Sequence, residues 1–464
     1  MLEQAKGMVA AGAGIDVDEA FSWLRHYARS RNLRLVDVAH DVAAGALAAS
    51  SLSAPPLPPP LRVPEAPAAL TEELASLAGI EPILGAVEAA APVDAVEVVV
   101  RELAAMLGVD DVSFLIADSS GESLIRFVRP TEPAPELSEP LETVPVAGTA
   151  YERALVSQRV QVVSEDGRYR LFAPVSDRGD ALGVLELMVA PRPDSGLLQK
   201  VASAAHALAY VLIASRRHTD FFESAQRSAP FSLAAEIQRQ LLPSSFTCET
   251  GQFTFAGWLE PASHVGGDTF DYSVDREALH VSLTDAMGRG VEAAQLATLV
   301  LGSLRNTRRA GLDPAERARR ANEEMTTYAG PDQFVTGLLL QADLRSGRVA
   351  VVNAGHPLPF LLRGGQVTKL ELEPDLPFGM RPGSSYREHE LHLEDGDRLV
   401  AITDGFLERN VMPDLEAADA VLRTASLHPR DVVHAFKFSV LATTQGVLGD
   451  DAAVLCIDWR GSVA

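Results

Sequence analysis

Four aspartates stand at the ends of apolar, strand-like runs, and this placement constrains the chain more than any other feature. Asp285 ends the alternating run ALHVSLT, Asp404 follows LVAIT, Asp450 precedes AAVLCI, and Asp268 lies just before TFDYSV. Alternation with a period of two predicts half-buried strands. Carboxylates at strand ends can converge from separate sheets on one edge of a β-sandwich, and we expect that arrangement here.

Such a group of carboxylates indicates a metal site. Carboxylate oxygens suit Mg²⁺ or Mn²⁺, whereas a site with few histidines and no thiolate argues against zinc or copper. Two divalent ions would activate water and screen the phosphoryl oxygens, as phosphate-ester hydrolysis requires. No GxSxG motif or Cys-His setting suggests a covalent nucleophile. The pattern therefore predicts a metal-dependent hydrolase, in which the small residues Ala286 and Gly405 allow the backbone to approach an ion.

Composition predicts a soluble, cytoplasmic protein of several domains. The 464 residues are 47% hydrophobic and 22% charged, which is typical of about three globular domains. A net charge of -23 disfavours broad nonspecific binding to nucleic acid or anionic lipid. Two cysteines exclude a disulfide framework, the N-terminus lacks a signal-peptide pattern, and the longest apolar stretch, residues 201–214, is interrupted by His206 and too short to span a bilayer.

The chain predicts a multidomain α+β protein. We expect a helical segment at 1–50, a proline-rich linker at 51–70, an α/β domain at 71–215, a connector helix at 216–230 and a sandwich domain at 231–464. Leu35, Val38, Ala39 and Val42 form one apolar stripe of the first segment. Its basic and acidic side chains nearly balance, so the charges fit either solvated helix faces or an RNA surface.

The wording of the first segment, LEQAKGMVAAGAGIDVDEAFSWLRHYARSRNLRLVDVAHDV, resembles the ANTAR family of helical RNA-binding modules, although the family's first helix would already be under way at residue 1. The resemblance implies an RNA-facing set and a core set. The residues that would face RNA are Lys6, Gly7, Arg25, Arg29 and Asn32. The residues that would form the core are Ala5, Phe21 and Leu24. Docking or dimerisation is the alternative role for this segment.

The middle pattern resembles a GAF domain. A helix at 93–107, a strand at 112–117, a helix at 149–157, a strand ending at Val163, two strands joined through residues 178–180 and a long helix from about residue 197 follow in that order. GAF domains bind small ligands or pair with themselves, which implies a homodimer through this domain and the connector helix. No cysteine between 71 and 215 is available for a bilin or a redox sensor, and His206 fits a packed position better than a haem ligand.

Seven ordered blocks between 231 and 458 resemble the SpoIIE-like branch of the PPM-type serine/threonine phosphatases: LAAEIQRQLLP, PASHVGGDTFDY, SLTDAMGRGVEAAQLA, QFVTGLLLQADLRSGRVAVVNAGHPLPFLL, LPFGM, GDRLVAITDGFLE and GDDAAVLCI. The resemblance implies two antiparallel sheets flanked by helices. It implies that Asp268 and Asp285 hold both metals, that the Ala286 carbonyl is a ligand, and that Asp404 and Asp450 complete the site. The implied substrate is a phosphorylated STAS-domain anti-sigma antagonist.

Further residues in these blocks have two interpretations each. Asp271 and Asp451 are either outer-sphere partners of the metals or solvated turn residues. Asn353 and His356 fit a loop-stabilising role better than acid catalysis, and Arg289 either steers phosphate or is an exposed loop residue. The sequence thus predicts a metal-dependent protein serine/threonine phosphatase controlled by its N-terminal modules. The alternative is an RNA-binding or signalling scaffold whose phosphatase-like domain is structural.

Overall fold

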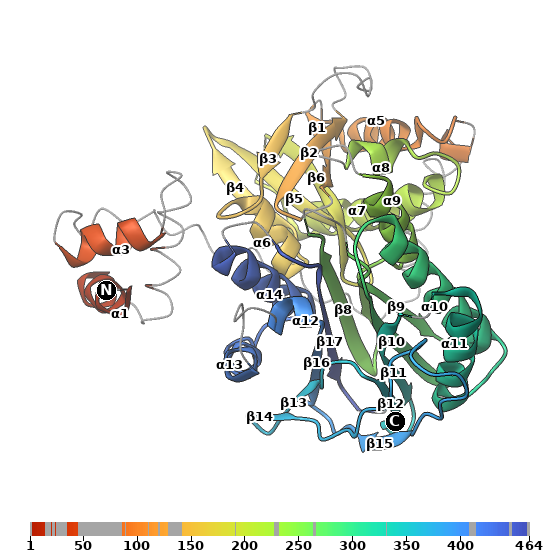
Figure 1. Cartoon of the computed structure of the whole chain (residues 1–464). Coiled ribbons are helices and arrows are strands. Elements are labelled where there is room, and N and C mark those ends of the chain that lie inside the picture. Colours follow the sequence, from red (N-terminus) through yellow and green to blue (C-terminus); the bar gives the residue numbers. More distant parts are fainter. Residues whose placement is uncertain are drawn as a thin grey trace. The chain divides into compact units, whose positions relative to one another are not determined.

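The protein divides into two compact units, the first comprising Met1–Asp177 with Ala181–Ala229 and the second Arg178–Asp180 with Pro230–Ala464 (Figure 1). The computed structural model describes residues 2–13, 20, 24, 35–44, 86–88, 90–109, 111–118, 121–128, 142–190, 192–226, 232–262, 266–330, 332–407, 414–444 and 448–461.

The N-terminal segment contains helices α1 (Leu2–Ala13) and α3 (Leu35–Ala43). The predicted stripe is confirmed at Val38, Ala39 and Val42, which are buried, as are Ala5 and Leu24. Lys6 is half-buried and Gly7 is exposed. The other predicted features of this part lie outside the described residues, namely Phe21, Arg25, Arg29, Asn32 and the linker at 51–70.

A six-stranded antiparallel sheet forms the centre of the first unit, in the order β3-β2-β1-β6-β5-β4. Its strands are β1 (Val112–Ala117), β2 (Ser123–Val128), β3 (Thr143–Pro145), β4 (Gln161–Glu165), β5 (Arg168–Asp177) and β6 (Asp180–Val189). Successive side chains of β1 point to opposite faces of the sheet. Phe114 and Ile116 pack in one core with α5 (Ala95–Leu107) and α7 (Ser195–Ser215), whereas Leu115 packs with Tyr151 of α6 (Ala150–Ser157).

A buried charge network lies on the α6 face of this sheet. The Glu186 carboxylate accepts hydrogen bonds from Arg126 Nη1 at 3.2 Å, Arg170 Nη1 at 2.5 Å and the Tyr151 hydroxyl at 2.5 Å. Burial and the hydrogen bond to Glu186 raise the pKa of Tyr151. Because an unpaired buried carboxylate is costly, these three donors together make the burial of Glu186 tolerable.

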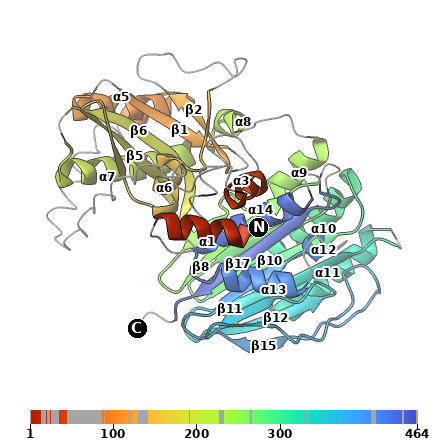
Figure 2. The same ribbon diagram turned by 90° about the vertical axis from the view of Figure 1, so that its left-hand side faces the viewer.

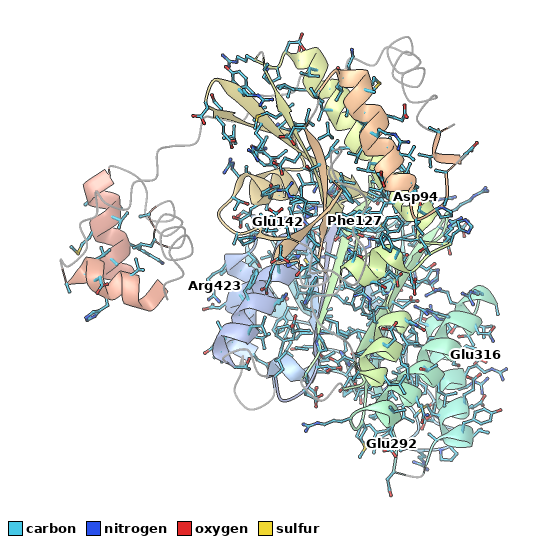
Figure 3. The ribbon with its side chains drawn as sticks, turned by 90° about the horizontal axis from the view of Figure 1, so that it is seen from above. Asp94, Phe127, Glu142, Glu292, Glu316 and Arg423 are labelled. Carbon is cyan, nitrogen blue, oxygen red and sulfur yellow. The ribbon has the colours of Figure 1, made fainter. Side chains whose placement is uncertain are left out.

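The predicted strands and helices between 93 and 215 are confirmed, but the continuous connector helix at 216–230 is wrong. α7 ends at Ser215, and only the short helix α8 (Phe221–Ala225) follows among the described residues before 227. Phe221 and Phe222 each lie with their ring centroids 5.4 Å from that of Phe127, which is labelled in Figure 3. These ring contacts hold α8 against the core of the first unit, so the chain turns instead of extending.

α7 is longer than the predicted apolar stretch. It has 21 residues, and in the described part of the chain it is the one helix whose length and composition would allow it to cross a membrane. Its Val201, Leu208 and Leu212 side chains are buried in the sheet-facing core of the first unit.

The second unit contains two antiparallel sheets, as predicted. The first sheet has the order β15-β12-β11-β10-β9 and the second β14-β13-β16-β17-β8-β7. Their strands are β7 (Thr247–Glu249), β8 (Phe253–Glu260), β9 (Thr269–Val274), β10 (Ala278–Ala286), β11 (Val335–Asp343), β12 (Arg348–Ala354), β13 (Phe360–Arg363), β14 (Gln366–Lys369), β15 (His389–His392), β16 (Arg398–Ile402) and β17 (Ala452–Trp459).

Helices cover both outer faces of this sandwich (Figures 1 and 2). α10 (Val291–Arg309) and α11 (Pro314–Tyr328) pack on the first sheet. α12 (Asp404–Leu407), α13 (Asp414–Arg423) and α14 (Pro429–Thr443) pack on the second. The helix that precedes β7, α9 (Leu233–Leu241), is capped by Ser232, whose side chain accepts a hydrogen bond from the Ala235 N–H.

Alternation along the strands divides the side chains between the layers. Leu283 of β10 and Leu455 of β17 meet between the two sheets, whereas Val454 and Cys456 of β17 face the helices. Cys248 belongs to the layer between the sheets. Since alternate residues share a face, Asp285, Thr403 and Asp451 continue the series that points between the sheets. The acidic residues therefore reach one edge of the sandwich from both sheets.

Candidate metal centre

Asp268 and Asp285 come from the same end of two paired strands. Thr269 of β9 pairs in register with Thr284 of β10, and their Oγ1 atoms lie 2.6 Å apart. Asp268 precedes the first of these threonines and Asp285 follows the second, so the antiparallel register brings the two aspartates to one end. Asp268 is 2% exposed.

Thr403 links this pair to the second sheet. Its Oγ1 donates to Asp268 Oδ2 at 2.6 Å and accepts from the Ala453 N–H at 2.9 Å, and its own N–H donates to the Ala453 carbonyl at 3.0 Å. Asp404 is the next residue along the chain. The Asp404 segment is thereby held beside Asp268.

Asp451 holds the loop that leads into Asp268. Its Oδ1 accepts from the N–H groups of Ala262 at 2.8 Å and Gly266 at 2.9 Å, and its Oδ2 accepts from Gln238 Nε2. Its own N–H donates to Asp450 Oδ1 at 2.9 Å. Asp451 is 1% exposed, so the interpretation as a solvated turn residue is wrong.

Two glycines are required by close backbone approach at this edge. A Cβ on Gly405 would lie 1.9 Å from the Asp451 carbonyl oxygen. A Cβ on Gly267 would lie 2.5 Å from the Ala286 Cβ and 2.7 Å from its carbonyl oxygen. Gly405 therefore allows the segments of Asp404 and Asp451 to touch, which differs from the predicted approach to an ion.

The carboxylates are close enough to perturb one another. Burial, followed by the charges of Asp285, Asp451 and Asp404, holds the pKa of Asp268 well above its usual range. Burial and the charges of Asp404, Asp450 and Asp451 raise the pKa of Asp285 to about 7, while a hydrogen bond shared with Asp268 acts in the opposite direction. Since like charges in a buried site favour protonation or a bound cation, the four acids form an electrostatic site for positive charge.

The donor set fits a hard divalent cation. Asp268, Asp285, Asp404 and Asp450 offer carboxylate oxygens, and Ala286 offers a backbone carbonyl, the ligand types of Mg²⁺ and Mn²⁺. Across the described ranges, no three histidine, cysteine or carboxylate side chains are already arranged around one point as ion ligands. The hydrogen bonds of Asp268 to Thr403 and Asp285 occupy oxygens that a cation would recruit.

Asp271 pairs with two arginines of α10. Its Oδ1 accepts from Arg305 Nε at 3.1 Å and Nη2 at 2.7 Å, and its Oδ2 accepts from Arg308 Nη1 at 2.6 Å. Asp271 is 3% exposed, so it is not a solvated turn residue. Its carboxylate joins β9 to α10 through ion pairs with Arg305 and Arg308.

Asn353 and His356 support a loop. Asn353 Nδ2 donates to the His356 carbonyl at 2.9 Å, and the His356 N–H donates to Asn353 Oδ1 at 2.7 Å. His356 Nδ1 lies 3.0 Å from Thr336 Oγ1. Burial lowers the pKa of His356 to about 3, so its ring is neutral at neutral pH and cannot serve there as a general acid.

Arg289 is exposed, and its Nη2 donates to the Gly449 carbonyl at 2.8 Å. It therefore joins the loop after Asp285 to the residue before Asp450.

Sequence reasoning missed Thr403 and Gln238. The alternation of Leu399, Ala401 and Thr403 could have identified the first, whereas no local pattern marks Gln238.

Comparison with known proteins identifies two regions of the chain. Residues 275–460 match the family described as Stage II sporulation protein E (SpoIIE), and residues 1–42 match the ANTAR domain family. Asp285, Asp404 and Asp450 lie within the first match, and Asp268 precedes it.

Two curated relatives are each similar to part of the chain. The chain is 24% identical over 194 residues to phosphoserine phosphatase RsbU of Bacillus subtilis (strain 168), covering 40% of this chain and 57% of RsbU. It is 24% identical over 182 residues to phosphoserine phosphatase RsbP of the same organism, covering 38% of this chain and 44% of RsbP. The chain thus spans about half the length of these relatives.

Among solved structures, the SiaA-PP2C domain of Pseudomonas aeruginosa is 22% identical, with a TM-score of 0.42, covering 49% of this chain and 93% of that domain.

Proposed function

We propose that the protein is a Mn²⁺- or Mg²⁺-dependent protein serine/threonine phosphatase. The observation that supports this most is the meeting of the Asp268, Asp285, Asp404 and Asp450 segments at one edge of the sandwich, where burial and neighbouring carboxylates raise the pKa values of Asp268 and Asp285. The similarity to the phosphoserine phosphatases RsbU and RsbP supports the same reaction.

The residues have separate tasks in this proposal. Asp268, Asp285, Asp404, Asp450 and the Ala286 carbonyl hold the cations, which we propose to be two. Bound cations would supply Lewis acidity to the phosphoryl group and to the attacking water. Thr403 and Asp451 orient the segments that carry the ligands, through the hydrogen bonds to Asp268 and to the loop at Ala262 and Gly266.

Phosphate release from an aryl phosphate tests the activity. We expect release that depends on added manganese, stops with EDTA, and is lost in Asp285→Asn and Asp404→Asn. Asp419→Asn is the matched control, because Asp419 has a 72% exposed side chain on α13 and pairs with Arg423. Full activity in EDTA, or in Asp285→Asn, would contradict the metal mechanism.

We propose as substrate a phosphorylated STAS-domain anti-sigma antagonist. The similarity to RsbU and RsbP supports a phosphoserine protein, and the net charge of -23 does not favour a polyanionic substrate. Adding enzyme and manganese to a cell lysate, followed by phosphoproteomics, should identify one or a few STAS-domain phosphopeptides that lose phosphate. Loss of phosphate from unrelated proteins alone would exclude this substrate class.

We further propose that residues 71–215 form a GAF-like sensor domain, that this domain and the segment after it contribute to a homodimer, and that the protein acts in the cytoplasm. The six-stranded antiparallel sheet with α5 and α7 on one face and α6 on the other supports the GAF-like assignment. Removal of residues 1–215 should change the phosphatase rate and the oligomeric state. Unchanged values of both would remove the regulatory proposal.

A second candidate function, RNA binding, is supported by the ANTAR match at residues 1–42. A gel shift of hairpin RNA by the full chain, weakened by charge reversal at Arg25 and Arg29, would favour it. An unshifted RNA at low salt would leave docking or dimerisation as the role of this segment.

A further inference from the structure

Exposed apolar side chains gather at the end of the first sheet that carries the candidate metal centre. Met287 follows β10, Val291 begins α10, and Leu376 and Met380 lie on the loop between β14 and β15. Each of these four residues is between 40% and 52% exposed. Single exposed apolar side chains are ordinary on a protein surface, whereas a contiguous group marks a contact surface.

Backbone hydrogen bonds join these residues into one row. The Met287 N–H donates to the Phe334 carbonyl at 3.1 Å, one residue beyond the pairing of Ala286 with Val335. The N–H groups of Val335 and Phe378 each donate to the carbonyl of the other residue, at 3.0 and 2.8 Å. Phe334 itself is half-buried, so an apolar side chain also stands on the middle segment. Two strand spacings make this row roughly 10 Å wide.

The row begins beside a candidate metal ligand. Met287 directly follows Ala286, and alternation along β10 places it on the same side as Asp285. A phosphoserine that reaches cations at Asp285 must therefore carry its neighbouring residues past the row. Because an extended chain rises about 3.3 Å per residue, the row matches about three residues of a bound substrate.

The loop between β14 and β15 is fixed in place by one buried side chain. Asn322 of α11 is fully buried. Its Oδ1 accepts from the Gly379 N–H at 2.9 Å, and its Nδ2 donates to the Arg381 carbonyl at 3.0 Å. Met380 lies between these two bonded residues. A surface held in this way loses little conformational freedom when a partner binds.

We infer that Met287, Val291, Phe334, Leu376 and Met380 form a docking surface that favours phosphoserine substrates with apolar residues beside the phosphorylated position. This inference depends on the proposed phosphatase function. Thioether side chains adapt to apolar partners of different shapes, so the surface suits a class of sequences and not a single one.

Two synthetic phosphoserine peptides test the inference, one with leucine on both sides of the phosphoserine and one with serine there. Both peptides need the same cations, so the ratio of their kcat/KM values separates the docking surface from the metal centre. The full chain is compared with Met380→Asp and with Met287→Asp. Val274→Asp is the matched control, because Val274 is 38% exposed and lies at the opposite end of β9 from Asp268.

We expect the unsubstituted protein to prefer the leucine peptide by roughly 10-fold, through KM and not kcat, as partial burial of apolar side chains provides. Met380→Asp and Met287→Asp should each reduce this preference to about twofold or less, because leucine would have to desolvate an ionised carboxylate. Val274→Asp should keep the preference of the unsubstituted protein.

Equal kcat/KM values for the two peptides in the unsubstituted protein overturn the inference. An unchanged ratio in either substituted docking residue, or an equal fall of the ratio in Val274→Asp, also overturns it, as does hydrolysis of an aryl phosphate with neither peptide cleaved. If an aspartate variant does not fold, Met380→Ser and Met287→Ser are measured in the same way, and an unchanged ratio there has the same meaning. Failure of the unsubstituted protein to hydrolyse an aryl phosphate with manganese would instead remove the proposed function itself.

Discussion

Replacing Asp285 by asparagine should make the metal-free protein more stable while removing its response to manganese. Burial and the charge of Asp404 raise the pKa of Asp285 from 3.8 to about 7 in the folded protein. At about 1.4 kcal/mol for each unit, the ionised carboxylate destabilises the metal-free fold by at most about 4 kcal/mol at pH 8. Because the amide must still be buried, we expect a gain of about 2 kcal/mol, which is roughly 4–8 °C in melting temperature for a domain of this size.

The sign of the pH dependence follows from a folded-state pKa that lies above the unfolded one. Below the unfolded value of 3.8 the acid is protonated in both states, and stability is lost as the pH rises through the folded value of about 7. The advantage of Asp285→Asn should therefore be absent near pH 4, grow towards pH 7 and then stay constant.

Thermal melts in EDTA and in manganese across this pH range provide the assay. Manganese should raise the melting temperature of the unsubstituted protein and not that of Asp285→Asn, since a ligand that binds only the folded state stabilises it. Asp343→Asn is a control of opposite sign: hydrogen bonds from Ser346 lower the pKa of Asp343, so its stabilising contribution is present above its unfolded pKa and is lost in acid. Melting of Asp285→Asn at or below the unsubstituted protein in EDTA at pH 8 would refute the reasoning.

Three further substitutions test the packing around the site and the first unit. Gly405→Ala places a Cβ 1.9 Å from the Asp451 carbonyl and should cost about 1–3 kcal/mol or more in urea unfolding, together with weaker manganese binding; normal values of both would contradict the close contact. Asp271→Asn leaves Arg305 and Arg308 without their carboxylate and should lower the free energy of unfolding in urea by about 3 kcal/mol. An unchanged free energy of unfolding would mean that solvent screens these ion pairs. Tyr151→Phe removes one of three donors to Glu186 and should cost about 1.5 kcal/mol in unfolding of the first unit without changing aryl-phosphate hydrolysis by the second; a cost near zero would indicate that the arginines alone satisfy Glu186.

The sequence predicts the sandwich and the strand-end positions of its acids because both depend on local periodicity. β9 illustrates how far alternation extends. Phe270 and Tyr272 face the layer between the sheets, so Asp268 shares their side of the strand and Asp271 does not. That parity was available in the letters TFDY, and it separates the candidate ligand from the residue that pairs with α10.

Contacts between distant segments were not available from local pattern. Gln238 is 30 residues from Asp268 and 213 from Asp451, and a glutamine on an amphipathic helix has no feature that selects these partners. The end of α7 was missed for a related reason. Phe221 and Phe222 continue a helical apolar pattern, and only the position of Phe127 in the folded sheet makes the chain turn there.

Both cysteines of this protein are buried in the second unit, in different layers of its sandwich. Cys248 lies with the side chains between the sheets, and Cys456 lies beneath the helices, where burial raises its pKa. A thiol reagent therefore reacts only when one of these two layers opens. The cysteine that is modified identifies the layer that opened. The two native cysteines can therefore be used to detect local unfolding of each layer by mass spectrometry, without an introduced label.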